Sequence, residues 1–248
     1  MTTIGSRGSY HHGDLRNALA AAALGLARVG GPESVVLREA ARQVGVSATA
    51  AYRHFAGQGD LLADVKSRAL GELTRWIGAA VQGCDARVEP GELAVARLRS
   101  AARAYLDFAF AEPGLFAAAF HHQGEWPERA TARAERGGTG GGGSSCVDVD
   151  VDVEIGIASG SGAASSSYGG ADFSQTDAFA SLVKVLDDLA ACGRMPAGRR
   201  PYAEFAAWSA IHGVAVLFLG GPLRLLPEAE RAAVLDHALE TCIRGLTH

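Results

Sequence analysis

The fold of this chain is decided by one stretch, Leu37-Arg38-Glu39-Ala40-Ala41-Arg42-Gln43-Val44-Gly45-Val46-Ser47-Ala48-Thr49-Ala50-Ala51-Tyr52-Arg53-His54-Phe55. Two short helices that cross steeply need a small residue where they touch and a turn residue that tolerates positive φ. Ala41 and Gly45 meet these two requirements. The apolar residues that would seal the crossing are Val44, Val46, Ala51 and Phe55. The stretch therefore predicts a helix-turn-helix.

The second of these helices is expected to run from Ala48 to Phe55, with Ser47 as its N-cap, and to enter the DNA major groove with its N-terminal residues toward the base edges. Tyr52 and His54 offer polar groups to phosphates, and Arg53 reaches a phosphate or a base. Arg42 on the preceding helix is a further phosphate candidate. In the alternative interpretation, Tyr52 and Phe55 are core residues and the arginines form a solvated face. We adopt the core interpretation for Phe55 only. The predicted DNA-binding residues are Arg38, Ser47, Ala48, Thr49, Ala50, Tyr52, Arg53 and His54.

Helical periodicity continues on both sides of this stretch. A first helix is expected with Asp14 as its cap and Gly30-Gly31-Pro32 as its end, and a long amphipathic helix is expected from Asp60 to about Val81. The apolar stripe of the first helix is Leu15, Leu19, Ala22, Leu26 and Val29. The later helices are expected at about 90–111, 172–192, 202–219 and 227–246, and a short apolar turn or helix is expected at 115–122.

No convincing run of strands appears, so the predicted class is all-α. We expect a three-helix DNA-binding domain at 1–58 and a larger ligand-binding and dimerisation domain at 59–248.

A Gly/Ser-rich insertion at 137–170 interrupts the pattern of the larger domain. At its centre lies Val147-Asp148-Val149-Asp150-Val151-Asp152-Val153-Glu154-Ile155. Strict alternation suits a strand, but a strand would place all four acids on one face about 7 Å apart, where they repel one another. We therefore expect a disordered linker, with an edge hairpin as the alternative.

Composition narrows the class further. Apolar residues make up 48% and charged residues 20% of the 248, with a net charge of −4, so the chain can bury a core. Residues 1–60 hold six arginines and four acidic residues, which leaves 17 basic and 23 acidic residues for the remainder. A mildly basic head on an acidic body suits one local DNA contact.

The cysteine content and the hydropathy of the chain indicate the cellular compartment of the protein. Four cysteines without a CxxC pair indicate neither a disulfide framework nor a zinc site. The N-terminus lacks the apolar segment of a signal peptide, and the longest apolar stretch, 208–219, is too short to span a bilayer. We therefore expect a soluble cytoplasmic protein that does not contact the membrane.

Three segments together carry a family resemblance: Tyr10-His11-His12-Gly13-Asp14-Leu15-Arg16, then 37–41, then Gly45-Val46-Ser47 through Tyr52-Arg53-His54-Phe55. Over residues 10–70 the chain closely resembles the tetracycline-repressor (TetR) family. Two segments of the body, 113–116 and 208–213, are similar to one branch of these regulators.

The resemblance implies that a fourth helix links the DNA-binding domain to a variable ligand domain. It also implies a homodimer through the last two helices, bound to a palindromic operator, with repression as the expected output. Ligand binding is expected to move the fourth helix and to alter the separation of the two recognition helices. Family members often carry a phosphate-binding lysine at the start of that helix; Gln58 stands there in this chain.

A pocket for a small-molecule effector is expected among the body helices. His212 is notable because a buried imidazole needs a polar partner, which is a ligand, a core group or an interface group. No carboxylate pair is evident, so an apolar or aromatic effector is expected, and no cofactor. Aromatic residues at helical spacing also serve as core. The candidates are Tyr105, Phe108, Phe116, Phe120, Trp126, Trp208 and His212.

An enzyme and an architectural DNA-binding protein are the rival classes. Residues 138–143 fit GxGxxG but follow no strand, and the motifs GxSxG, GxxxxGK[ST] and HExxH are absent, so we expect no enzyme. Adjacent His121 and His122 point apart on a helix, which disfavours a metal site with Cys146. The acids at 148–154 lack the turn glycine of a calcium loop. The acidic body disfavours non-specific DNA binding.

Overall fold

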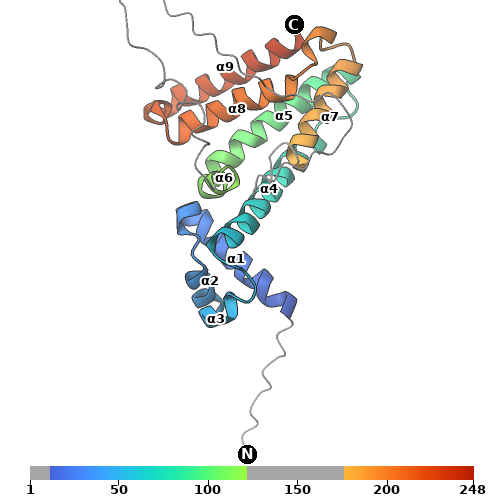
Figure 1. Cartoon of the computed structure of the whole chain (residues 1–248). Coiled ribbons are helices and arrows are strands. Elements are labelled where there is room, and N and C mark those ends of the chain that lie inside the picture. The colour runs from blue at the N-terminus through green and yellow to red at the C-terminus, as the bar shows by residue number, and fades with distance from the viewer. Residues whose placement is uncertain (1–11, 122–175) are drawn as a thin grey trace, which may run out of the picture. The chain divides into compact units, whose positions relative to one another are not determined.

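The computed structural model describes residues 12–121 and 176–248, and the long regular elements within these two ranges are helical (Figure 1). The all-α prediction is confirmed for this part of the chain. The α-helices are α1 (His12–Gly30), α2 (Leu37–Val44), α3 (Ala48–Ala51), α4 (Gln58–Gln82), α5 (Pro90–Ala111), α6 (Pro113–Ala119), α7 (Asp177–Ala191), α8 (Ala203–Leu219) and α9 (Glu228–Thr247).

Helix α1 differs from its prediction at both ends. It begins at His12, so Asp14 lies inside the helix and is not its cap. Its buried face holds Leu19 and the small residues Ala20, Ala23 and Ala27, whereas Val29 is 91% exposed. The predicted stripe was therefore wrong at Val29. The three alanines shift the buried face because they let α2, α4 and α6 approach α1 closely.

Helix α3 is shorter than predicted. It ends at Ala51, and residues 52–54 continue as turns. The bond of the Arg53 N–H to the Ala50 carbonyl has i→i−3 spacing, which tightens the chain after the helix. This tightening directs the fully buried Phe55 into the core beneath α3.

Helix α4 begins at Gln58, two residues before the predicted start, and Asp60 lies in its first turn. The Asp60 carboxylate accepts a hydrogen bond from the Ala56 N–H at 3.0 Å. The helix contacts α1 at one end and α5, α6 and α7 further along, so it joins the N-terminal helices to the body. Its buried residues are Leu61, Leu62, Val65, Ala69, Leu70, Leu73 and Ile77.

Helix α5 is the centre of the body and contacts α4, α6, α7, α8 and α9. Its predicted range is confirmed. The Glu89 side chain caps it, accepting hydrogen bonds from the Gly91 and Glu92 N–H groups at 2.9 and 3.0 Å. These backbone donors, together with Arg194, hold the pKa of Glu89 below its ordinary value.

Helices α8 and α9 pack against each other and close the chain (Figure 1). Their outer surfaces carry exposed apolar side chains, among them Phe205, Val216 and Leu217 on α8 and Val234 on α9, although the Phe205 ring also contacts Phe179 of α7. No helix in the described ranges is long and apolar enough to cross a membrane. The predicted insertion at 137–170 and the effector candidate Trp126 lie outside the described residues.

Candidate nucleic-acid interface and body cavities

The turn between α2 and α3 has the geometry that a helix-turn-helix requires. Gly45 caps α2 in the left-handed conformation, at φ 78° and ψ 28°, and the Val46 N–H donates to the Ala41 carbonyl at 3.0 Å. A residue with a Cβ is strained at this φ, so the glycine fixes the crossing of the two helices. Ala41 and Ala51 are buried where the helices meet.

The first turn of α3 is presented to solvent. The Ser47 hydroxyl accepts a hydrogen bond from the Ala50 N–H at 3.2 Å and so caps the helix as predicted. Thr49 is exposed, and Ala48 and Ala50 are half-buried. These side chains lie on the outer surface, where a DNA groove has access to them. Their assignment as base contacts remains a prediction.

The residues that follow α3 separate into core and surface. Phe55 is fully buried, whereas Tyr52 is 48% exposed and Arg53 is exposed. The core interpretation is therefore correct for Phe55 and wrong for Tyr52. His54 is half-buried. Phosphate contacts by Tyr52 and His54 remain predictions.

The arginines of this surface are not equivalent. Arg42 is paired with Glu39 through two hydrogen bonds of 2.9 and 2.7 Å, and this pairing lowers the pKa of the Glu39 carboxyl. Arg38 and Arg53 are exposed and form no ion pair with any residue in the described ranges. The guanidinium groups of Arg38 and Arg53 are therefore available to bind phosphate, whereas Arg42 must first break its ion pair with Glu39.

Arg16 is a functional candidate that the sequence pattern did not reveal. Its guanidinium lies 4.1 Å from the centre of the Phe55 ring and donates a hydrogen bond to the His54 carbonyl. One of its nitrogens is also 3.7 Å from the Asp60 carboxylate. Arg16 thus connects α1 to His54 and Phe55, which follow α3, and to the start of α4. Its place in the motif at residues 10–16 could have indicated a role, but the spacing of the residues does not predict which way its side chain points.

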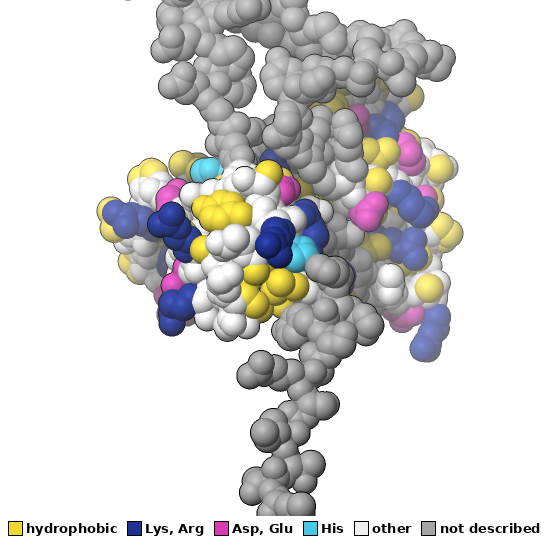
Figure 2. Space-filling view, turned by 60° about the horizontal axis from the view of Figure 1, so that its bottom comes forward, with side chains coloured by type: hydrophobic (Ala, Val, Ile, Leu, Met, Phe, Trp, Pro, Cys, Tyr) yellow, Lys and Arg dark blue, Asp and Glu magenta, His cyan; other side chains and the backbone are white. Residues whose placement is uncertain are grey.

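Figure 2 shows the N-terminal end of the molecule, where α2 and α3 lie. Basic side chains are scattered there among polar and hydrophobic ones and do not form a continuous basic patch. A surface of this kind is better suited to a defined set of contacts than to charge-driven binding along any polyanion.

In the body, the described aromatic candidates other than Phe108 form one cluster around His212. The Tyr105 hydroxyl and His212 Nδ1 are 2.7 Å apart, and the Phe116 ring is stacked on the imidazole with centroids 5.4 Å apart. Phe120 and Trp208 contact the same imidazole. Burial lowers the pKa of His212, so the neutral imidazole is favoured.

A small apolar cavity of about 50 Å³ lies beside this cluster. Of the effector candidates that the structure describes, only Tyr105 and Trp208 line it; Phe108 is fully buried and lies elsewhere in the core. The role of each candidate as an effector contact remains a prediction. The cavity is lined by Ile77, Leu98, Ala101, Ala102, Tyr105, Ala178, Leu182, Ala207, Trp208, Ile211, Leu239, Cys242 and Ile243.

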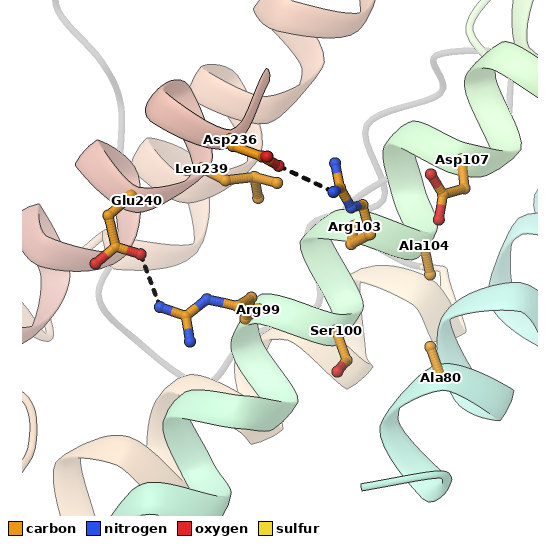
Figure 3. Close-up of a pocket in the computed structure, with 9 residues that line it drawn as sticks. All are labelled: Ala80, Arg99, Ser100, Arg103, Ala104, Asp107, Asp236, Leu239 and Glu240. Atoms are coloured by element: carbon orange, nitrogen blue, oxygen red, sulfur yellow. Dashed lines mark hydrogen bonds and ion pairs between the residues drawn. The ribbon is translucent and has the colours of Figure 1, made fainter. Parts of the chain in front are cut away.

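A second, open hollow of about 540 Å³ lies between α5, α9 and the end of α4 (Figure 3). Two ion pairs cross it, Arg99 to Glu240 at 2.7 Å and Arg103 to Asp236 at 2.9 Å. None of the effector candidates in the described part of the chain lines it. Exposed ion pairs add little stability each, but two in parallel fix the register of α9 along α5. Within the described ranges, no group of three or more His, Cys, Asp or Glu residues could hold a metal ion.

The corner between α5 and α6 touches α1. Glu112 accepts a hydrogen bond of 2.8 Å from the Arg28 guanidinium. Gly114 packs so closely that a Cβ there would overlap the carbonyl oxygens of Ala27 and Arg28. The body is therefore connected to the recognition helices at two places, through α4 and through this contact.

Comparison with known proteins agrees with this architecture. Residues 164–242 match the family model described as "Tetracyclin repressor-like, C-terminal domain". No curated protein matches the chain.

Three solved structures share the fold over nearly the whole chain. A protein of unknown function from Rhodococcus sp. RHA1 is 24% identical, with a TM-score of 0.63, and the alignment covers 98% of this chain and 100% of that one. A regulatory protein, SCO4313, is 18% identical, with a TM-score of 0.54 and coverage of 96% and 98%. A TetR family transcription regulator from Shewanella sp. PV-4 is 14% identical, with a TM-score of 0.51 and coverage of 94% and 98%.

The helical architecture with its N-terminal helix-turn-helix is similar to that of these solved structures, and residues 164–242 match the model of the tetracycline-repressor-like C-terminal domain.

Proposed function

We propose that the chain is a ligand-responsive, sequence-specific repressor that binds a palindromic operator as a homodimer. The observation that carries this proposal is the first turn of α3. It is capped by Ser47, supported from below by Phe55, and open to solvent at Thr49. A rigid, exposed helix of this kind can be inserted into a major groove without rearrangement of the fold.

The proposed dimer interface is the outer face of α8 and α9. On α8, exposed apolar side chains alternate with small ones, and small residues allow two helices to approach closely. Pairing of two copies through this face would form a four-helix bundle. The exposed or half-buried residues of this face are Phe205, Ala206, Ser209, Ala210, Gly213, Val216 and Leu217 on α8, and Val234, His237 and Thr241 on α9.

A two-fold dimer makes the recognition helices symmetric. In operators of this type the two half-sites lie about 34–36 Å apart, one turn of DNA. The operator is therefore expected to be a palindrome whose half-sites are read in opposite directions.

The effector site is assigned to the apolar cavity beside Tyr105 and Trp208. A volume of about 50 Å³ is far below the roughly 300–1,000 Å³ of ordinary ligand pockets, so an effector must push the lining helices apart. Its walls are almost entirely hydrocarbon, and Tyr105, which lines it, has its hydroxyl 2.7 Å from His212 Nδ1. This favours an apolar or aromatic effector with one hydrogen-bonding group.

Expansion of the cavity supplies the mechanism of release. Ile77 of α4 is one of its walls, and Phe116 of α6 packs on Tyr105 with ring centroids 5.7 Å apart. An effector that prefers the expanded body would displace α4 and α6, the two body helices that contact α1. A ligand shifts an equilibrium only through its differential affinity for the two states. The effector must therefore bind the expanded state more tightly, and the tightly packed body without effector favours the DNA-binding state.

The experiment is a fluorescence-anisotropy titration of the full chain against the DNA that flanks its own gene, at near-physiological salt with unrelated DNA as competitor. Binding that survives the competitor supports a sequence-specific regulator. Binding that is weak, salt-sensitive and fully displaced by competitor would contradict the proposal and favour a non-specific DNA-binding protein.

A further inference from the structure

The first turn of α3 contains only short side chains. Thr49 is exposed, Ala48 and Ala50 are half-buried, and the Ser47 hydroxyl is engaged with the Ala50 N–H. The next exposed long side chains, Tyr52 and Arg53, come after the helix has ended. The part of the recognition helix that would lie deepest in a groove therefore presents methyl groups and one hydroxyl.

This restricts how the helix can read bases. Direct readout in the major groove uses bidentate hydrogen bonds from Arg, Lys, Asn or Gln, acceptance by Asp or Glu, or apolar contact with the C5-methyl group of thymine. None of the long polar residues occurs at positions 47–51. Alanine and the threonine methyl are the side-chain groups that contact thymine methyls.

Short side chains also permit a close approach. With nothing longer than threonine on its first turn, α3 can bring its backbone near the base edges, so its methyl groups can exclude water from the thymine methyls. Burial of one methyl-sized group is worth about 0.8 kcal/mol, close to a fourfold change in affinity. Several such contacts add up to useful discrimination against cytosine or a purine.

We propose that Ala48, Thr49 and Ala50 recognise thymine methyl groups, so that each operator half-site carries thymines where the first turn of α3 meets the groove. This inference rests on the proposed function, since it concerns the same DNA. Arg53, which forms no ion pair with a described residue, is left for a phosphate or a guanine at the edge of the half-site.

The test begins with selection of bound duplexes from a random-sequence DNA library by the full chain. The selected half-site is then synthesised with deoxyuridine in place of thymidine, one position at a time. Uracil keeps every hydrogen-bonding group of thymine and lacks only the methyl. The expected result is a loss of about fourfold at each contacted position and no change outside the half-sites.

A matched variant assigns the contact to a side chain. Thr49→Ser keeps the hydroxyl and removes the methyl, so it should weaken binding to the thymine duplex and reduce the loss caused by uracil at one position. Thr74→Ser is the control, because Thr74 lies on α4 with its hydroxyl bonded to the Leu70 carbonyl, far along the chain from α3. It should leave every thymine-to-uracil ratio unchanged.

The outcomes separate this inference from the function on which it rests. If a sequence is selected but uracil is tolerated at every half-site position, thymine recognition is overturned and the specific regulator stands. A thymine-to-uracil ratio in Thr49→Ser equal to that of the wild type would remove Thr49 from the contact. If no sequence is enriched, the proposed function itself fails.

Discussion

Gly114, at the start of α6, packs directly against the carbonyl oxygen of Ala27 in the last turn of α1. No other residue type fits there, because any Cβ would enter the space of that oxygen and of the neighbouring Arg28 carbonyl. The contact lies between the helix that carries Phe116, beside the cavity, and the helix that supports the recognition segment. A conformational change in the body can therefore be transmitted through this contact to α1 and the helices that pack on it.

Replacement of Gly114 with alanine should destabilise the fold by about 1–3 kcal/mol, because backbone atoms on both sides must move apart. It should also weaken operator binding in the absence of effector. Urea unfolding and DNA titration measure the two effects. Gly71→Ala on α4 is the control: the added methyl group would meet nothing within 4 Å, and it should stabilise the helix by up to about 1 kcal/mol. Equal stability of the two variants would contradict the close contact.

The contacts of Arg16 predict a distinctive response to salt. Arg16→Ala should reduce operator affinity because the His54 carbonyl and the Phe55 ring lose their partner. It should leave the slope of log affinity against log salt unchanged, because Arg16 is engaged within the protein. Arg53→Ala, which removes an exposed charge, should reduce that slope by about one. Titrations at several salt concentrations distinguish the two, and a reduced slope for Arg16→Ala would show that it contacts phosphate instead.

His212 predicts a dependence of stability on pH. Burial holds its pKa below the ordinary value of about 6.5, so the unfolded chain binds more protons than the folded one as the pH falls below that value. The stabilising contribution is present above the unfolded pKa and is lost as the pH falls through the folded pKa. Urea unfolding from about pH 7.5 to 5.5 should show a smaller decline for His212→Gln than for the wild type. Identical declines would contradict the assignment.

The outer face of α8 predicts how the protein assembles. Ala210→Arg places a long charged side chain at the centre of the proposed interface and should yield a folded monomer by light scattering. Operator affinity should fall by about 100-fold or more, since linked half-sites gain roughly 10²–10⁴ over single ones. Ala191→Arg, at an exposed position at the end of α7, is the control and should remain dimeric. A dimeric Ala210→Arg protein would place the interface elsewhere.

Local sequence patterns predicted the elements whose signals are short-range. Gly45 and Ser47 marked the turn and the cap between α2 and α3, and Pro90 marked the start of α5. Pro113 was interpreted as the end of the preceding helix, with the next element expected from Leu115, whereas α6 begins at Pro113 itself. At these positions the constraint is set by the residue itself: positive φ, a side-chain acceptor or a missing N–H.

Features set by packing could not be predicted in the same way. Val29 fits an apolar stripe, but the buried face of α1 follows its alanines because α4 and α6 approach closely there. Arg16 stands in a recognisable motif, but its contacts with His54 and Phe55 depend on where α3 ends. The effector candidates were chosen as aromatic residues, yet most of the cavity wall is aliphatic, and which alanine or leucine faces a cavity depends on how helices pair.

The central claim is that two copies of α3 read a palindrome one turn of DNA apart. Hydroxyl-radical footprinting of the full chain on its bound DNA tests it most directly. The account predicts two protected half-sites whose centres are about 10 base pairs apart, or a whole multiple of that turn, with mirror-related patterns on the two strands. A single protected site, or protection that spreads along the DNA with increasing protein, would contradict it.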